Sequence, residues 1–150
     1  LLKVPNVHSR WGSLFEPWVG EKFNYIVDDV SGVAKSIADI SPWFKDVPCD
    51  SGIDGTDLVI KVIQQSPEHL TRGGKLFFPI VSLSNKVRIY QEAVRVFEKV
   101  EKIATGIFPL PKEMYKHLDL MKDLKLQGYI DYKSVFGGII FWTDIYLAQS

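Results

Sequence analysis

The chain has 150 residues, enough for one domain with a hydrophobic core, and its 46% hydrophobic content is ordinary for a globular protein. Eighteen basic and eighteen acidic residues cancel, which argues against broad electrostatic capture of nucleic acid or of an anionic membrane. No apolar run approaches the roughly 20 residues that span a bilayer. The single cysteine, Cys49, excludes an internal disulfide and fits a reducing, cytoplasmic compartment.

The first third of the chain predicts two strands and a helix. A short strand is expected at residues 7–11, followed by a loop at 12–17. Aromatic and β-branched side chains then predict a buried strand at Phe23–Val27. Apolar spacing predicts a helix within residues 33–44 that ends near Ser41, and a loop rich in Asp, Gly and Pro covers residues 46–55.

The remainder alternates helices and strands. A helix capped by Thr56 or Asp57, kinked or restarted at Pro67 and stopped by Gly73-Gly74, leads to a buried strand at 75–81. A long amphipathic helix follows, whose predicted inward stripe is Val87, Tyr90, Ala93 or Val94, Phe97 and Val100. The last predicted elements are a strand at 103–108, a helix at 111–126 and a long strand at 139–148 that follows the segment 129–135 and a turn at 136–138.

This alternation predicts one α/β domain, with a Rossmann-like, doubly wound and mostly parallel sheet covered on both faces. The last two strands are expected to pair antiparallel, because no second crossover helix fits after Gly128. The strand Phe23–Val27 is apolar on both sides and carries no edge protection, so it should have two neighbours. The chain also begins with Leu1 rather than methionine. We therefore expect one or more strands N-terminal to Leu1 to complete the sheet. A homo-oligomer is the other partner that stays open.

Two carboxylates, Asp28 and Asp29, directly follow the strand Phe23–Val27. Ligands of open α/β sheets bind at the carboxyl ends of strands, so this position is a candidate site. The alternative is that both residues only stabilise a turn and the next helix. The three histidines and Cys49 have no metal-ligand spacing, so no metal site is expected. Trp43 ends the following helix and is a candidate for lining a substrate entrance.

Three stretches carry a family resemblance, over roughly residues 4–105. Residues 12–17 (Gly-Ser-Leu-Phe-Glu-Pro) are similar to a Gly/Ser-Asp-Leu-Phe loop, and residues 23–31 to Phe-Asp-x-Ile-Val followed by Asn-Pro-Pro-Tyr. Residues 54–58 and 69–76 look like an Asp-Gly-x-x-x-Leu helix and a Leu-Lys-x-Gly-Gly strand lead-in. In this order, the stretches resemble the C-terminal half of class I S-adenosylmethionine-dependent methyltransferases, in the branch of release-factor glutamine methyltransferases and "small domain" methyltransferases.

The resemblance implies roles for named residues. Ser13 and Leu14 would lie beside the adenine of S-adenosylmethionine, and Asp28 would face its methyl group. Asp28 and Asp29 would act in catalysis by orienting an attacking amine or hydroxyl or by accepting its proton. Asp29, Ser31 and Trp43 would contact the substrate, a protein, nucleic-acid or small-molecule acceptor.

Two positions depart from the family pattern. Ser13 replaces the family's adenine-side aspartate, and Asp29-Val30-Ser31-Gly32 replaces Asn-Pro-Pro-Tyr. Glutamine methylation is therefore not expected. Two functions remain open: a methyltransferase with an altered acceptor, whose glycine-rich cofactor turn lies upstream, and a Rossmann-like binding or scaffold domain that no longer catalyses. No G-x-G-x-x-G dinucleotide motif is present.

Overall fold

The computed structural model describes residues 6–150 and shows a mixed α/β fold built on an open five-stranded sheet. The strands are β1 (Phe23–Val27), β2 (Leu70–Val81), β3 (Lys99–Pro109), β4 (Lys133–Val135) and β5 (Gly138–Gln149). Their order across the sheet is β1-β2-β5-β3, and β4 pairs with the beginning of β5. The last strand of the sequence therefore lies inside the sheet, between β2 and β3.

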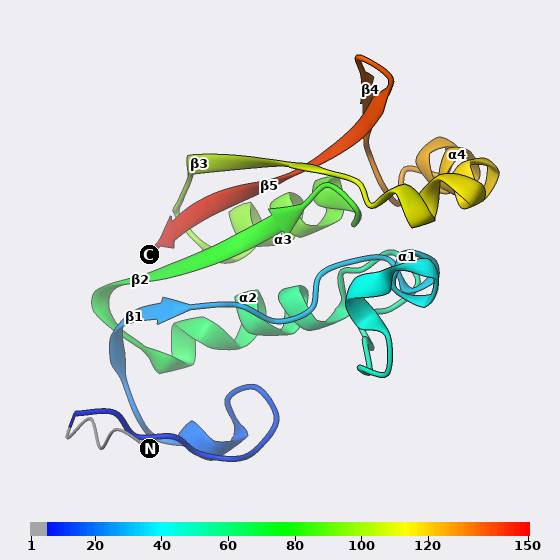
Figure 1. Ribbon diagram of the computed structural model, residues 1–150. Coiled ribbons are helices and arrows are strands. Elements are labelled where there is room, and N and C mark those ends of the chain that lie inside the picture. Colours follow the sequence, from blue (N-terminus) through cyan, green and yellow to red (C-terminus); the bar gives the residue numbers. More distant parts are fainter. Residues whose placement is uncertain (1–5) are drawn as a thin grey trace.

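Strand direction separates β5 from the other four strands. β1 pairs with β2 in parallel, whereas β5 is antiparallel to β2, β3 and β4. β1–β4 therefore share one direction and β5 runs against them, as Figure 1 shows for β1, β2 and β5. The predicted antiparallel C-terminal strand is confirmed. The predicted mostly parallel pairing is wrong, because the insertion of β5 leaves β1–β2 as the only parallel pair within residues 6–150.

Two amphipathic helices cover one face of the sheet. α2 (Asp57–His69) and α3 (Lys86–Val96) pack against alternate residues of β2, among them Leu76 and Phe78, and against Ala148 of β5. Apolar residues recur every three or four positions in the helices and every second position in the strands. Each element therefore has one apolar face that packs against the other layer. This layer holds the first of two hydrophobic clusters.

The second hydrophobic cluster lies beyond the carboxyl ends of β1 and β2, where the shorter helices gather (Figure 1). These helices are α1 (Lys35–Ile40), η2 (Pro42–Phe44), η3 (Lys112–His117) and α4 (Leu118–Leu126), where η denotes a 3-10 helix. Ile37, Met114 and Met121 are fully buried among them. No helix in residues 6–150 has the length and apolarity needed to cross a membrane.

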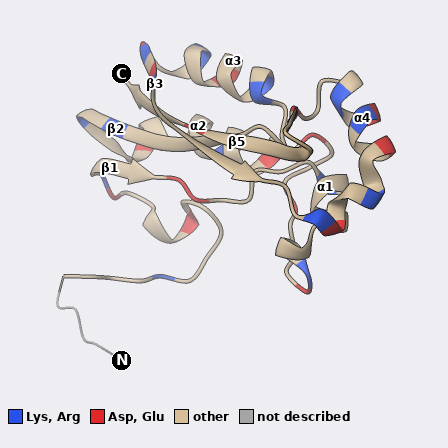
Figure 2. Ribbon diagram, turned by 45° about the horizontal axis from the view of Figure 1, so that its top comes forward, with Lys and Arg blue, Asp and Glu red and all other residues tan. Residues whose placement is uncertain are grey.

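β1 and the neighbouring part of the second sheet face are uncovered. β1 pairs only with β2 and forms an edge of the described sheet. Tyr25 and Val27, which point away from α2, are 65% and 75% exposed. In Figure 2, β1 and β5 are almost free of charged residues, whereas α3 and α4 carry several. Helices were predicted on both faces, but this apolar part of the second face has no helix among the residues described.

The segment before β1 contains no strand in residues 6–22. A strand was predicted at 7–11, but these residues are irregular and exposed, because three consecutive polar side chains leave the segment without an apolar face. The segment turns through η1 (Glu16–Trp18) instead. The guanidinium of Arg10 lies 4.4 Å from the Trp18 ring centroid, which joins the two ends of this turn.

The helix predicted at 33–44 is interrupted. α1 spans six residues, and the Ser41 side chain then accepts a hydrogen bond from the Trp43 N–H at 3.1 Å, which begins η2 separately. α2 continues for two residues after Pro67, so this proline lies near the end of one helix and does not start a new one. The predicted helix at 111–126 is likewise divided, into η3 and α4.

The inward stripe predicted for α3 is confirmed only in part. Ala93 and Phe97 are buried as predicted, and Ile89 is also fully buried, whereas Val87, Tyr90 and Val94 are between 41% and 57% exposed. The predicted stripe extended to Val100, but α3 ends at Val96 and Val100 belongs to β3. The observed stripe consists of Ile89, Ala93 and Phe97, which are four residues apart. Val87, Tyr90 and Val94 form a second apolar side of the same helix, and the sequence alone did not distinguish the two sides.

β2 begins five residues earlier than predicted, and Gly73 and Gly74 lie inside it. Leu70 pairs with Phe23, and the register between β1 and β2 shifts directly afterwards. Gly73 has a φ of +73°, and a Cβ on Gly74 would lie 3.0 Å from the Phe23 carbonyl oxygen. The two glycines therefore form a bulge in the sheet rather than the end of the helix.

Candidate functional site

Asp28 follows β1 directly and lies at the carboxyl end of the parallel pair β1–β2. Its N–H donates to the Phe77 carbonyl oxygen at 2.8 Å, so the pairing continues through it. Its Oδ1 accepts a hydrogen bond from the Val30 N–H at 3.0 Å and stabilises a turn. Asp28 is only 7% exposed. The structural role considered for this residue is thus present, but it uses only one of the two carboxyl oxygens.

The second oxygen of Asp28 has no hydrogen-bond partner. Within residues 6–150, Oδ2 is the buried side-chain polar atom that remains unpaired. Burial raises the pKa of Asp28 from 3.8 to about 6; the Val30 N–H opposes this rise, and the neighbouring Asp29 charge adds to it. An unpaired buried carboxyl costs free energy, and such groups are found most often at functional sites.

A pocket of about 310 Å³ lies beside Asp28 at the edge of β1, and we call it the edge pocket. Leu14, Phe15 and Trp18 form one wall, and Val62 of α2 contributes to the lining. Leu14 has a φ of +48°, a left-handed conformation that is uncommon outside glycine and is often found at functional positions. Leu14 and Asp28, both predicted to contact a cofactor, therefore line the same pocket.

A second pocket, of about 370 Å³, opens on the uncovered face of the sheet, and we call it the face pocket. Its walls include Phe77 and Pro79 of β2 and Thr143 and Ile145 of β5. Asp28 and Asp29 line this pocket as well as the edge pocket. The pair of carboxylates predicted from the sequence thus lies between two predominantly apolar hollows.

The predicted substrate residues are only partly brought together. Asp29 is exposed and lines both pockets. Ser31 is half-buried and lines neither of them. Trp43 is 43% exposed, and its ring packs against Phe141 with 5.2 Å between ring centroids. Trp43 therefore belongs to the helical cluster beyond the sheet and not to the pockets at Asp28.

Ser13 lies next to the edge pocket rather than in it. Its N–H donates to Glu16 Oε2 at 3.3 Å, and its carbonyl oxygen accepts the Glu16 N–H at 3.0 Å. It lines a separate hollow together with Leu14 and Lys61. Because the Ser13 amide is engaged within its own turn, Leu14 is the residue of this predicted pair that contacts the edge pocket.

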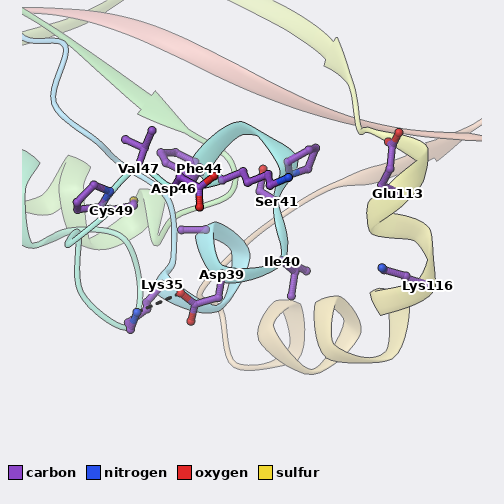
Figure 3. A pocket seen from close by; sticks show the side chains of 14 residues that line it. Lys35, Asp39, Ile40, Ser41, Phe44, Asp46, Val47, Cys49, Glu113 and Lys116 are labelled. Atoms are coloured by element: carbon purple, nitrogen blue, oxygen red, sulfur yellow. Dashed lines mark hydrogen bonds and ion pairs between the residues drawn. The ribbon is translucent and has the colours of Figure 1, made fainter.

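A larger hollow, of about 520 Å³, lies between the α1–η2 segment and η3 (Figure 3). Its lining includes Lys35 and Lys116 together with Asp39 and Glu113, and Lys35 Nζ lies 3.1 Å from Asp39 Oδ1. Bases and acids balance in this lining, and it contains no buried unpaired group such as Asp28 Oδ2. Size alone therefore does not make this hollow the candidate site.

Several lining residues were not found from the sequence. Phe77 lies opposite Val27 only because of the β1–β2 register, and Thr143 enters the face pocket only because β5 is inserted beside β2. Neither position carries a local signal. Phe15 and Trp18, in contrast, lie in or next to the loop that the sequence singled out, and their aromatic side chains were the available indication.

Within residues 6–150, no group of three or more His, Cys, Asp or Glu side chains is arranged to hold a metal ion. No protein-family model, no curated protein and no solved structure matches the chain. The fold and the site define an open-sheet α/β protein that carries a buried, unpaired carboxyl at the end of a parallel strand.

Proposed function

We propose that the chain is the C-terminal half of an S-adenosylmethionine-dependent methyltransferase domain. The acceptor would be a nitrogen or oxygen nucleophile of a protein, a nucleic acid or a small molecule. The observation that carries the proposal is the edge pocket, where Leu14 and Asp28 meet at the carboxyl end of β1. The resemblance assigns one residue to the cofactor's adenine and the other to its methyl group, and open α/β sheets bind ligands at this end.

The strand arrangement supports a Rossmann-like origin for the sheet. β1 and β2 are parallel and joined through helices, and the final strand β5 has the opposite direction. Tyr25 and Val27 leave the β1 edge both apolar and exposed, although such an edge is usually covered or charged. We propose that further strands pair with this edge and carry the glycine-rich turn that the sequence lacks.

The residues present fit the two chemically distinct ends of S-adenosylmethionine. Leu14 and Phe15 provide an apolar surface suited to adenine, and Asp28 provides negative charge suited to the sulfonium. The edge pocket is at the lower end of the size range of ligand sites, so it would hold part of the cofactor. When bound, the cofactor supplies the activated methyl group, and Asp28 and Asp29 orient the acceptor.

A non-catalytic binding or scaffold domain is the second candidate. It is favoured by the Ser13 amide, which is engaged with Glu16, and by the altered sequence Asp29-Val30-Ser31-Gly32. In that case the exposed edge of β1 would bind a polypeptide strand rather than complete a catalytic sheet.

Isothermal titration calorimetry of the full-length polypeptide with S-adenosylmethionine and S-adenosylhomocysteine distinguishes the two candidates. The methyltransferase proposal expects micromolar dissociation constants for both compounds. Leu14→Arg, which fills the edge pocket, should weaken both at least about tenfold, an effect of about 1.4 kcal/mol. Leu126→Arg, at a position 86% exposed on α4, serves as the control and should bind normally. Absence of binding by folded wild-type protein contradicts the methyltransferase proposal.

A further inference from the structure

Asp28 lacks a counter-ion, in contrast to the other deeply buried aspartate. Arg88 Nη1 lies 3.1 Å from both carboxyl oxygens of Asp54. The edge and face pockets around Asp28 have no Lys, Arg or His in their linings. Their titratable side chains are Asp28, Asp29 and Tyr25. The linings of the two pockets therefore hold two carboxyls and no basic side chain.

Aromatic rings line both pockets beside these two carboxyls. Phe77 lines the face pocket, and Phe15 and Trp18 line the edge pocket, where Arg10 already lies over one face of Trp18 and His69 stacks on one face of Phe15. The face of an aromatic ring attracts cations, and this attraction is strongest where water is excluded. A buried carboxylate adds a full negative charge to the same surroundings. The combination favours an organic cation over a neutral or anionic ligand.

We propose that the methyl acceptor of this site is an amine that arrives as a cationic ammonium group and gives one proton to Asp28. This inference rests on the proposed methyltransferase function. It adds the substrate class, and it assigns the proton to the Asp28 carboxyl, whose buried Oδ2 has no hydrogen-bond partner and which lines both pockets.

The reaction balances in two steps. The ammonium group R–NH₃⁺ first passes a proton to the Asp28 carboxylate, which leaves R–NH₂ and a neutral carboxylic acid. The nitrogen lone pair then forms a bond to the methyl carbon of S-adenosylmethionine while the carbon–sulfur bond breaks and its electron pair stays on sulfur. The products are R–NH₂⁺–CH₃ and a neutral thioether, so the total charge is unchanged. Asp28 returns its proton to water after the product leaves.

The chemistry of Asp28 suits an amine better than a hydroxyl or an amide. Burial raises the pKa of this carboxyl to about 6, which brings it closer to that of an ammonium group that is itself desolvated. An aliphatic hydroxyl is a far weaker acid, and a carboxyl would be too weak a base for it. An amide nitrogen has no free lone pair and no acidic ammonium proton to give.

The test compares two probes of the same shape, 2-phenylethylammonium chloride and 2-phenylethanol, by NMR titration of the full-length polypeptide. At about pH 7.5 the first probe is a cation and the second is neutral. The amide resonances of Val30 and Thr143 report on the turn beside Asp28 and on the face pocket. We expect the ammonium probe to bind at least about tenfold more tightly, and Asp28→Asn to abolish this preference. Asp39→Asn, which removes the same charge from α1, should preserve it.

Equal binding of both probes, no binding of the ammonium probe, or a preference that survives Asp28→Asn would each overturn the proposal. Calorimetry on the same samples separates this outcome from failure of the proposed function. Binding of neither cofactor form contradicts the methyltransferase function itself.

Discussion

Asp28 and Asp54 are equally buried, each 7% exposed, but their surroundings differ. Asp54 accepts hydrogen bonds from Thr56 Oγ1 at 2.8 Å, from Asn85 Nδ2 at 3.2 Å and from Arg88. Asp28 accepts one backbone N–H. Burial tends to raise the pKa of Asp54, but its hydrogen bonds and the Arg88 charge outweigh burial and lower it. For Asp28, burial prevails and the pKa rises to about 6.

The difference separates a structural carboxylate from a candidate functional one. Asp54 connects the loop before α2 to the start of α3, where the Asn85 N–H also donates to the Asp54 carbonyl oxygen. All of its polar capacity is used within the fold. Asp28 has an oxygen left over at the end of a strand, beside two pockets. Unmade hydrogen bonds therefore distinguish the site.

The largest effect on stability is expected for Asp54→Ala. This change leaves Arg88 and Thr56 without their buried partner, and removal of one member of such a network costs about 3 kcal/mol. Urea unfolding followed by circular dichroism measures the free energy of unfolding. Asp50→Ala, at an exposed position of the same loop, should change it by less than about 0.5 kcal/mol. If Asp54→Ala lowers the free energy of unfolding by less than about 0.5 kcal/mol, Asp54 is not a structural carboxylate.

Asp28→Asn is expected to raise the free energy of unfolding, whereas Asp54→Ala lowers it. At about pH 8 it should stabilise the protein by about 2 kcal/mol, because it replaces an unpaired buried charge by a neutral group of the same shape. The same unfolding measurement applies. Stability equal to or below that of the wild type would show that the Asp28 carboxylate is satisfied, contrary to its unpaired Oδ2.

The pH dependence of unfolding sharpens this contrast. The pKa of Asp28 is about 6 in the folded protein and 3.8 is its ordinary value, so the folded state binds the extra proton between these values. The gain from Asp28→Asn should therefore vanish on acidification from about pH 7 to about pH 4. Asp54 has a lowered pKa, so its contribution should instead be lost as the pH falls below its ordinary value of 3.8. If the changes in unfolding free energy caused by Asp28→Asn and by Asp54→Ala depend on pH in the same way, the two carboxyls do not differ in pKa as described.

The smallest effect is expected for Asp29→Asn. Asp29 is exposed, so the free energy of unfolding should change by less than about 0.5 kcal/mol. The pKa of Asp28 should fall, because the Asp29 charge contributes to raising it. NMR titration of the Asp28 carboxyl carbon measures this shift. A pKa that stays the same or rises in this variant would show that the two carboxyls do not interact.

Local sequence patterns predicted the strands whose residue types favour extended backbone wherever they occur. The bounds of β1 at Phe23–Val27 were predicted as observed, and β5 differs from its predicted range by one residue at each end. Both strands are rich in aromatic and β-branched residues. The strand at residues 7–11 was wrong, and Gly73-Gly74 were misjudged because a glycine pair serves equally at the end of a helix and in a bulge.

The sequence by itself determined that a strand at Phe23–Val27 ends in two carboxylates, because strand propensity and the residues that follow are local properties. The predicted burial of this strand is wrong for the described residues, because β1 lies at the edge of the sheet and none of its residues is buried. Tertiary structure decided which carboxylate is buried, since the Asp28 N–H bonds to Phe77 while Asp29 stays exposed. It also decided that β5 enters between β2 and β3, which brings Thr143 to the face pocket. Such pairings depend on contacts between distant residues, and no local pattern encodes them.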